Sequence, residues 1–263
     1  MKRTTNDPST WFDSAHHRSL GVNARRTTEL ILALDVPTHA QAMRLVKLLY
    51  PKVRIFKVGL QLYTACGPKI VADIRRAGAE VFLDLKFNDI PNTMASAAIE
   101  AVKHKAAMFT VHTLSGPEAL KEVAKVTKGT GTKALGVTIL TSICAHFLKD
   151  LKIQRSLSQE VLYLAQMAKR CGLDGVVCSV NEAALLRRKI KGKFIIVTPG
   201  IRPDAAACDD QKRAATISQA LEAGSDYLVV GRPILDASDP LKAAQNFIRL
   251  CRGGFETRPY RRY

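Results

Sequence analysis

The densest cluster of chemically capable side chains lies between Asp84 and Thr93, in the string DLKFNDIPNT. Residues two apart in a strand face the same side, so Asp84 and Lys86 are expected to point the same way, with Asp89 following after a turn. Opposite charges this close favour the ionised form of each group. The pattern predicts a site in which the Lys86 ammonium donates a proton between carboxylates. The alternative interpretation of Asp84 and Lys86 is a structural ion pair.

Eight short apolar, β-branched runs alternate with segments of helical period. Near-continuous apolar runs indicate strands buried on both faces, as in a parallel sheet. The runs span residues 30–36, 54–59, 80–86, 107–112, 134–140, 175–179, 194–198 and 226–231. Apolar residues recur at helical spacing after the first run (Ala42, Leu45, Val46, Leu49) and after the third (Ala95, Ala98, Ile99, Val102), which predicts helices that bury one face.

Eight such units over about 225 residues match a single-domain (β/α)8 TIM barrel of the α/β class. The alternative is a doubly wound open sheet, but the first run is followed by Asp-Val-Pro-Thr and not by G-x-G-x-x-G. The barrel is expected to span residues 29–248. A basic N-terminal extension over residues 1–28 and a basic C-terminal tail over residues 249–263 are expected to flank it.

Barrel enzymes place their chemistry at the C-terminal ends of the strands, and phosphate commonly binds after strands seven and eight. Those two predicted strands lead into TPGIRP and VGRP, in which glycine admits an anion to the backbone and arginine adds a forked contact. The sequence therefore predicts a phosphate-bearing substrate. His112 also ends a strand, and a lone histidine there is more often a hydrogen-bonded wall residue than a base.

The chain has 263 residues and a formal net charge of +17. Residues 1–27 carry five basic and two acidic side chains, and residues 249–263 carry five basic and one acidic, so the ends supply +7. Without an RNA-binding aromatic motif, zinc-finger spacing or basic helix, this charge predicts a surface that favours anionic substrates, with no specific nucleic acid as partner.

Six cysteines occur without a C-x-x-C pair, which predicts reduced thiols and a cytoplasmic location. No apolar run approaches 18 residues, so no membrane partner is expected. The His, Cys, Asp and Glu residues show neither zinc spacing nor a magnesium-type acidic triplet. No metal and no cofactor are therefore expected.

Seven strings together resemble the bacterial orotidine 5′-phosphate decarboxylase family: ILALDV, FKVG, DLKFNDIPNT, TILTS, TPGIRP, DQKR and VGRP. The resemblance covers residues 29 to about 245 and implies a homodimeric barrel. It implies cofactor-free and metal-free conversion of orotidine 5′-monophosphate to UMP, the last step of pyrimidine nucleotide synthesis. Lys86 is then the proton donor between Asp84 and Asp89, with Asp89 reaching into the partner's site. The implied substrate contacts are to the ribose (Asp35, Lys57), the nucleotide (Thr93, Thr141) and the phosphate (Gln211, Gly231, Arg232, with Arg202 in support).

One departure lies inside the most specific string, where Asn88 replaces the commoner His of DLKFHD, and little effect is expected. Two other functions remain as alternatives. Magnesium-dependent sugar-phosphate decarboxylases share D-x-K-x-x-D, but the I-P-N-T continuation and DQKR argue against them. An RNA-binding protein on a non-catalytic barrel predicts missing rim residues, whereas the whole set is present.

Overall fold

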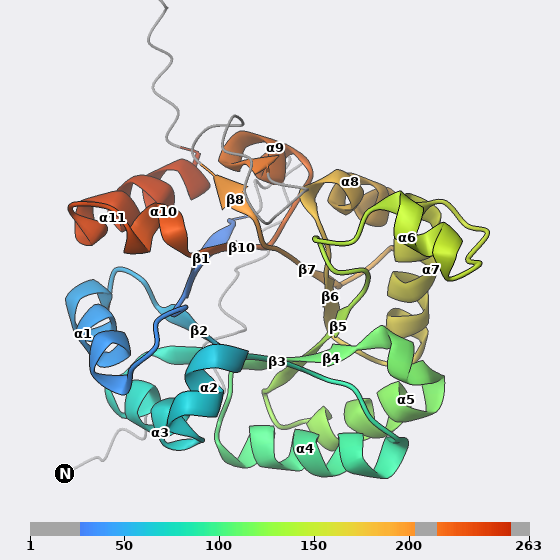
Figure 1. The fold of residues 1–263 in the computed structure, drawn as a ribbon, viewed down its shortest axis with the longest axis horizontal. Helices are drawn as coiled ribbons and strands as arrows, with labels where there is room; N and C mark the ends of the chain where they lie inside the picture. Colours follow the sequence, from blue (N-terminus) through green and yellow to red (C-terminus); the bar gives the residue numbers. More distant parts are fainter. Residues whose placement is uncertain (1–26, 203–214, 254–263) are drawn as a thin grey trace, which may run out of the picture.

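The computed structural model describes residues 27–202 and 215–253. Eight parallel strands close into a barrel in the order β1-β10-β7-β6-β5-β4-β3-β2 (Figure 1), which confirms the predicted fold class. They are β1 (Glu29–Ala33), β2 (Ile55–Gly59), β3 (Glu80–Phe87), β4 (Met108–His112), β5 (Lys133–Val137), β6 (Gly175–Val177), β7 (Ile195–Thr198) and β10 (Tyr227–Val230). Each of the eight predicted runs contains one of these strands or overlaps it closely. Gln211 and most of both predicted tails lie outside the described residues.

A second, two-stranded sheet was not predicted. It pairs β8 (Ile201–Arg202) with β9 (Ala215–Thr216) in parallel. Arg202 therefore lies in a short strand that follows β7, where the sequence predicted none. No helix in the described ranges is both long and apolar enough to cross a membrane.

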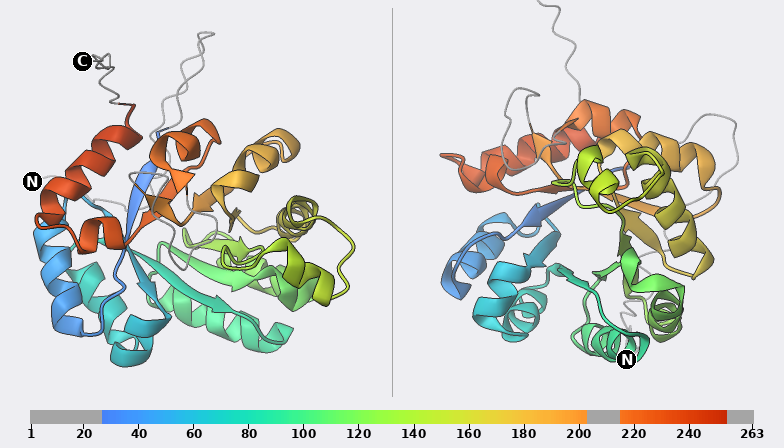
Figure 2. Two further views of the ribbon diagram at one scale, coloured as in Figure 1. Left: turned by 45° about the horizontal axis from the view of Figure 1, so that its top comes forward. Right: turned by 45° about the vertical axis from the view of Figure 1, so that its right-hand side comes forward.

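Helices surround the barrel, as both views in Figure 2 show. They are α1 (His39–Leu49), α2 (Leu60–Cys66), α3 (Lys69–Arg76), α4 (Pro91–Lys103), α5 (Gly116–Thr127), α6 (Ala145–Asp150), α7 (Leu157–Arg170), α8 (Val180–Lys189), α9 (Ile217–Glu222), α10 (Arg232–Leu235) and α11 (Pro240–Cys251), with a 3-10 turn, η2 (Thr113–Ser115), before α5. The predicted stripe of α1 is buried as expected.

The stripe predicted for α4 is wrong. The buried residues are Met94, Ala98 and Ala101, whereas Ile99 is 41% exposed. Apolar residues occupy most of the circumference of this helix, so their spacing does not single out one face. The contacts of α4 in the folded protein select the buried face.

Two apolar cores follow from the period-two alternation of the strands. In β1, Ile31 and Ala33 point into the barrel and pack in a layer with residues such as Phe82 of β3. Leu30 and Leu32 point outward into the larger core beneath the helices. The barrel interior is thus filled with side chains, and substrate access is restricted to its rim.

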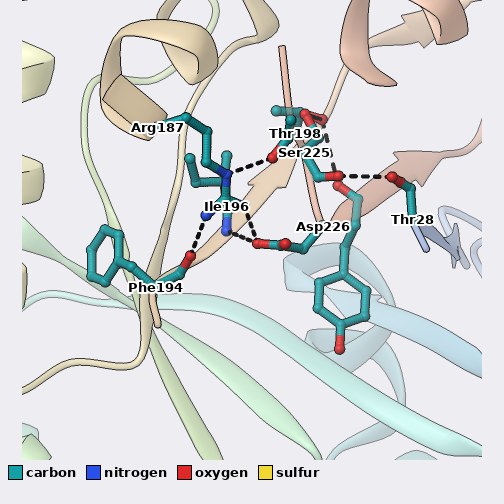
Figure 3. Close-up of polar contacts among 9 residues, drawn as sticks. Thr28, Arg187, Phe194, Ile196, Thr198, Ser225 and Asp226 are labelled. Atoms are coloured by element: carbon teal, nitrogen blue, oxygen red, sulfur yellow. Dashed lines mark hydrogen bonds and ion pairs between the residues drawn. The ribbon is translucent and has the colours of Figure 1, made fainter. Parts of the chain in front are cut away.

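Polar contacts of Arg187 and Asp226, here called the polar clasp, join α8 to β7 and β10, the strands that precede TPGIRP and VGRP (Figure 3). Arg187 donates hydrogen bonds of 2.6 Å to the carbonyl oxygens of Gly224 and Phe194, and its guanidinium also contacts the Asp226 carboxylate. Asp226 Oδ2 accepts a 2.8 Å bond from the Ile196 N–H. The clasp holds β7 and β10 in register, and both strands lead to the candidate site.

Candidate active site

Four charged side chains of alternating sign meet at the C-terminal rim of the barrel. Lys57 Nζ, from β2, lies 3.0 Å from Asp35 Oδ1 and 3.7 Å from Asp84 Oδ2. Lys86 Nζ lies 3.0 Å from Asp84 Oδ1. The sequence had suggested that Asp35 lies within the first strand. In the structure it lies two residues beyond the end of β1. The order Asp35–Lys57–Asp84–Lys86 places each inner charge between two of opposite sign.

Burial along this charged chain is uneven. The side chains of Lys57 and Asp84 are 11% and 15% exposed, whereas those of Lys86 and Asp35 are 31% and 55% exposed. The two inner charges are thus largely withdrawn from water and depend on their partners. Lys86 at one end remains accessible, so its ammonium can reach a bound molecule.

The contact between Asp84 and Lys86 confirms that they lie together, but the physical reason differs from the predicted one. In the β3–β4 register, Leu83 pairs with Phe109 and Phe87 pairs with Val111. Residues 84–86 therefore face one residue of β4, and the strand bulges there. Lys86 has a φ of 53°, in the left-handed region. The bulge, and not a regular period of two, brings its ammonium to Asp84.

Thr110, the β4 residue opposite the bulge, is a site residue that the sequence analysis missed. It is fully buried, its hydroxyl donates a 3.0 Å bond to Asp84 Oδ1, and its oxygen accepts a 2.9 Å bond from the Lys86 N–H. The available signal was its position two residues before His112, which places both on one face of β4.

Gly59, at the end of β2, was also missed. A Cβ at this position would lie 2.8 Å from Lys57 Nζ and 3.6 Å from Asp35 Oδ1. Glycine is thus what allows the Lys57 ammonium to approach the strand end closely. Its position directly after F-K-V was the only signal, and it is a weak one.

Of the predicted phosphate residues, Gly231 lies beside Asp35, at the outer end of the charged chain. A Cβ at Gly231 would lie 3.6 Å from Asp35 Oδ2, so the end of β10 is next to Asp35. Arg232 follows on the surface, while Arg202 is only 8% exposed. The structure thus brings Gly231 to the rim site and places Arg232 on its outer edge.

The remaining predicted residues lie around the rim outside the four-charge chain. Asp89 and Thr93 are exposed at the start of α4, and Asp89 Oδ1 accepts a 2.7 Å bond from the Ile90 N–H. Thr141 is half-buried in the segment after β5. Asn88 Oδ1 accepts a 2.7 Å bond from the Ser115 hydroxyl.

His112 is half-buried at the end of β4, and its Nδ1 accepts a 3.4 Å bond from the Leu114 N–H. Burial lowers its pKa, and the positive charge of Lys86 lowers it further. Both effects favour the neutral imidazole. This supports the interpretation of His112 as a wall residue. Within residues 27–202 and 215–253, no three His, Cys, Asp or Glu side chains are grouped to hold a metal ion.

Comparisons with known proteins identify the family of this chain. The model of the "Orotidine 5'-phosphate decarboxylase / HUMPS family" matches residues 28–247. Orotidine 5'-phosphate decarboxylase of Syntrophotalea carbinolica is 48% identical over 234 residues, which cover 86% of this chain and 95% of that protein. The protein of the same name from Geobacter metallireducens is 47% identical over 222 residues, covering 82% and 93%.

Among solved structures, orotidine 5'-phosphate decarboxylase from Lactobacillus acidophilus superposes with a TM-score of 0.74 at 36% identity, covering 84% of this chain and 97% of that one. The family match spans all eight strands of the barrel and includes every rim residue described above. The chain therefore belongs to the orotidine 5'-phosphate decarboxylase / HUMPS family.

Proposed function

We propose that this protein decarboxylates orotidine 5′-monophosphate to UMP and CO2, the last step of pyrimidine nucleotide synthesis, without a cofactor or metal. The observation that carries the proposal is the alternating chain Asp35–Lys57–Asp84–Lys86 at the barrel rim, which leaves an accessible ammonium at one end. The names of the relatives support the same reaction. The proposal includes a cytoplasmic location, which the cysteine pattern predicts.

The reaction demands what Lys86 can supply. When the bond between C6 of the pyrimidine and its carboxylate breaks, CO2 leaves and the electron pair stays on C6. No adjacent carbonyl spreads that charge, so a preorganised positive group must stabilise it. The Lys86 ammonium stabilises the carbanion and transfers a proton to C6, which yields UMP. The neutral amine then regains a proton from water.

The other rim residues have binding roles in this proposal. Asp35 and Lys57 bind the ribose, Thr93 and Thr141 contact the nucleotide, and the phosphate end is formed by Gly231 and Arg232 together with Gln211 and Arg202. Phosphate contacts distant from C6 provide binding energy that can be used to reach the transition state. The protein acts as a homodimer in which Asp89 completes the partner's site, and its exposed position at the start of α4 supports this assignment.

The test is a spectrophotometric assay with orotidine 5′-monophosphate on the wild type, Lys86→Ala and Lys105→Ala. Lys105 is a matched control because its φ of 55° is close to the 53° of Lys86, while it lies after the C-terminus of α4. We expect Lys86→Ala to lose several orders of magnitude in kcat while remaining folded, and Lys105→Ala to behave as wild type. Near-normal turnover by folded Lys86→Ala, or no turnover by the wild type, refutes the proposal.

A chelator separates this proposal from the magnesium-dependent alternative. We expect turnover to be unchanged after dialysis against EDTA. Loss of activity that returns with Mg²⁺ would refute the metal-free part of the proposal, and failure to turn over orotidine 5′-monophosphate even with Mg²⁺ would favour the sugar-phosphate reaction.

A further inference from the structure

The backbone of Lys86 is in an unfavourable conformation at an unusual place. Three non-glycine residues in the described ranges have a positive φ: Lys86, Lys105 and Lys152. Lys105 and Lys152 follow the C-termini of α4 and α6, where left-handed residues are common. Lys86 lies inside β3. Such a conformation persists only where the surroundings impose it.

The Thr110 hydroxyl is the group that contacts this backbone. Its oxygen accepts the Lys86 N–H at 2.9 Å, and its proton is donated to Asp84 Oδ1 at 3.0 Å. The same carboxylate oxygen accepts the Lys86 ammonium at 3.0 Å. Lys86 is thus held at its backbone by Thr110 and at its side-chain end by Asp84, and Thr110 links the two.

We propose that Thr110 is a positioning residue. It holds the bulge of β3 in the conformation that places the Lys86 ammonium beside Asp84 at the rim. Thr110 is fully buried and acts through its two partners. Without this buried hydroxyl, the Lys86 N–H and Asp84 Oδ1 each lose a hydrogen bond. The left-handed conformation then has one fewer contact to impose it, and the ammonium is free to move. The expected effect on kcat rests on the proposed function, whereas the role of Thr110 in holding the backbone of Lys86 does not.

Three variants test it. Thr110→Val removes the hydroxyl and keeps the shape, and Thr110→Ser keeps the hydroxyl. Thr113→Val is the matched control, because Thr113 is equally buried and its hydroxyl donates to the Val137 carbonyl oxygen, outside the site. We expect Thr110→Val to lower kcat by about 10- to 100-fold with little change in KM, since small misplacements of a reacting group have effects of this size. Thr110→Ser should recover most of the loss, and Thr113→Val should retain wild-type kcat.

Hydrogen exchange of the Lys86 amide, followed by NMR, provides a readout independent of activity. We expect this amide to lose protection in Thr110→Val and to keep it in Thr110→Ser and Thr113→Val. Should Thr110→Val not fold, Thr110→Ala replaces it in both measurements. Unchanged kcat and unchanged Lys86 protection in the hydroxyl-less variant would overturn the inference, as would a serine variant as impaired as the valine variant.

The two proposals fail in different ways. If the wild type does not decarboxylate orotidine 5′-monophosphate, the proposed function fails, while amide exchange still decides whether Thr110 holds Lys86. If the wild type is active and Thr110→Val matches it in turnover and exchange, only the role of Thr110 fails.

Discussion

The ammonium of Lys57 lies 3.7 Å from Oδ2 of Asp84 and so faces the carboxylate oxygen that Lys86 does not contact. Each oxygen of Asp84 thus has its own cation, one from β2 and one from β3. Because Asp84 is only 15% exposed, the two cations offset its withdrawal from water. Because Lys57 and Lys86 contact different oxygens of Asp84, the Lys86 ammonium lies at the accessible end of the four-charge chain.

The position of Lys57 depends on the absence of a side chain at Gly59. We expect Gly59→Ala to displace the Lys57 ammonium, because the new Cβ would lie 2.8 Å from Nζ. The end of a lysine side chain moves readily, so the melting temperature should change little. The displacement should lower kcat/KM by about 10- to 100-fold. A melting curve and steady-state kinetics check both parts, and wild-type kinetics would show that Lys57 tolerates the shift.

Arg232 is predicted to bind the substrate phosphate. We expect Arg232→Ala to cost roughly 2–4 kcal/mol in kcat/KM for orotidine 5′-monophosphate, by analogy with other preorganised charge contacts. Orotidine, which lacks the phosphate, should be affected almost not at all, because the lost contact has no partner in that substrate. The comparison of the two substrates is the control. An equal loss on both would identify Arg232 as structural.

Asp89 is predicted to serve the partner's site, which a two-fold interface permits. We expect a mixture of inactive Lys86→Ala and inactive Asp89→Ala to regain activity after subunit exchange. In a mixed dimer, one site collects both defects and the other collects none. Random pairing makes about half of the dimers mixed, so activity should recover to about a quarter of wild type.

Native mass spectrometry provides the control for that experiment by confirming that mixed dimers form. If Asp89 served its own subunit, every site would retain one defect. Confirmed exchange with activity still at the mutant level therefore excludes a shared site.

His112 gives a pH dependence with a defined sign. Its pKa in the folded protein is lowered, first by burial and then by the charge of Lys86. As the pH falls below the ordinary histidine pKa of about 6.5, the unfolded chain binds the proton first, so this residue's contribution to the free energy of unfolding decreases. Its contribution is fully present above that pH.

NMR titration of the His112 ring checks the electrostatic part of this statement. We expect Lys86→Met to raise the pKa of His112 only partly towards its ordinary value, because burial remains. Lys105→Met is the control and should leave it unchanged. A wild-type His112 that titrates at or above the ordinary pKa would contradict the prediction.

The clasp of Arg187 and Asp226 should matter for stability. Their side chains are 17% and 25% exposed, and removing one partner of a largely buried pair leaves the other uncompensated. We expect Arg187→Ala to lower the free energy of unfolding by about 2–3 kcal/mol. The neighbouring Arg188 is exposed, and Arg188→Ala should change it by less than about 0.5 kcal/mol. Denaturant titrations of both variants measure these changes. Equal losses in the free energy of unfolding would show that the clasp does not stabilise the fold.

Local pattern was sufficient for the barrel. A strand such as β4 is recognisable because a buried parallel strand needs a short, nearly continuous apolar run, and that requirement acts on adjacent residues. The candidate site was predictable for a related reason. Charged residues such as Asp84 and Lys86 are costly in apolar strands, so their presence at strand ends indicates function.

Tertiary structure decided the features that depend on partners distant in the chain. The bulge at Lys86 exists only in the register between β3 and β4, and Thr110 becomes a site residue only by facing it. The buried face of α4 depends on its neighbours. Ile99 and Met94 are both apolar, and only packing in the folded protein determines that Met94 is buried and Ile99 exposed. By itself, the sequence indicated the four charged residues that meet at the rim, since periodicity and charge are local properties. The direction of the Lys86 side chain could be known only from the fold. Its backbone conformation is determined by a hydrogen bond to a neighbouring strand and not by spacing along its own strand.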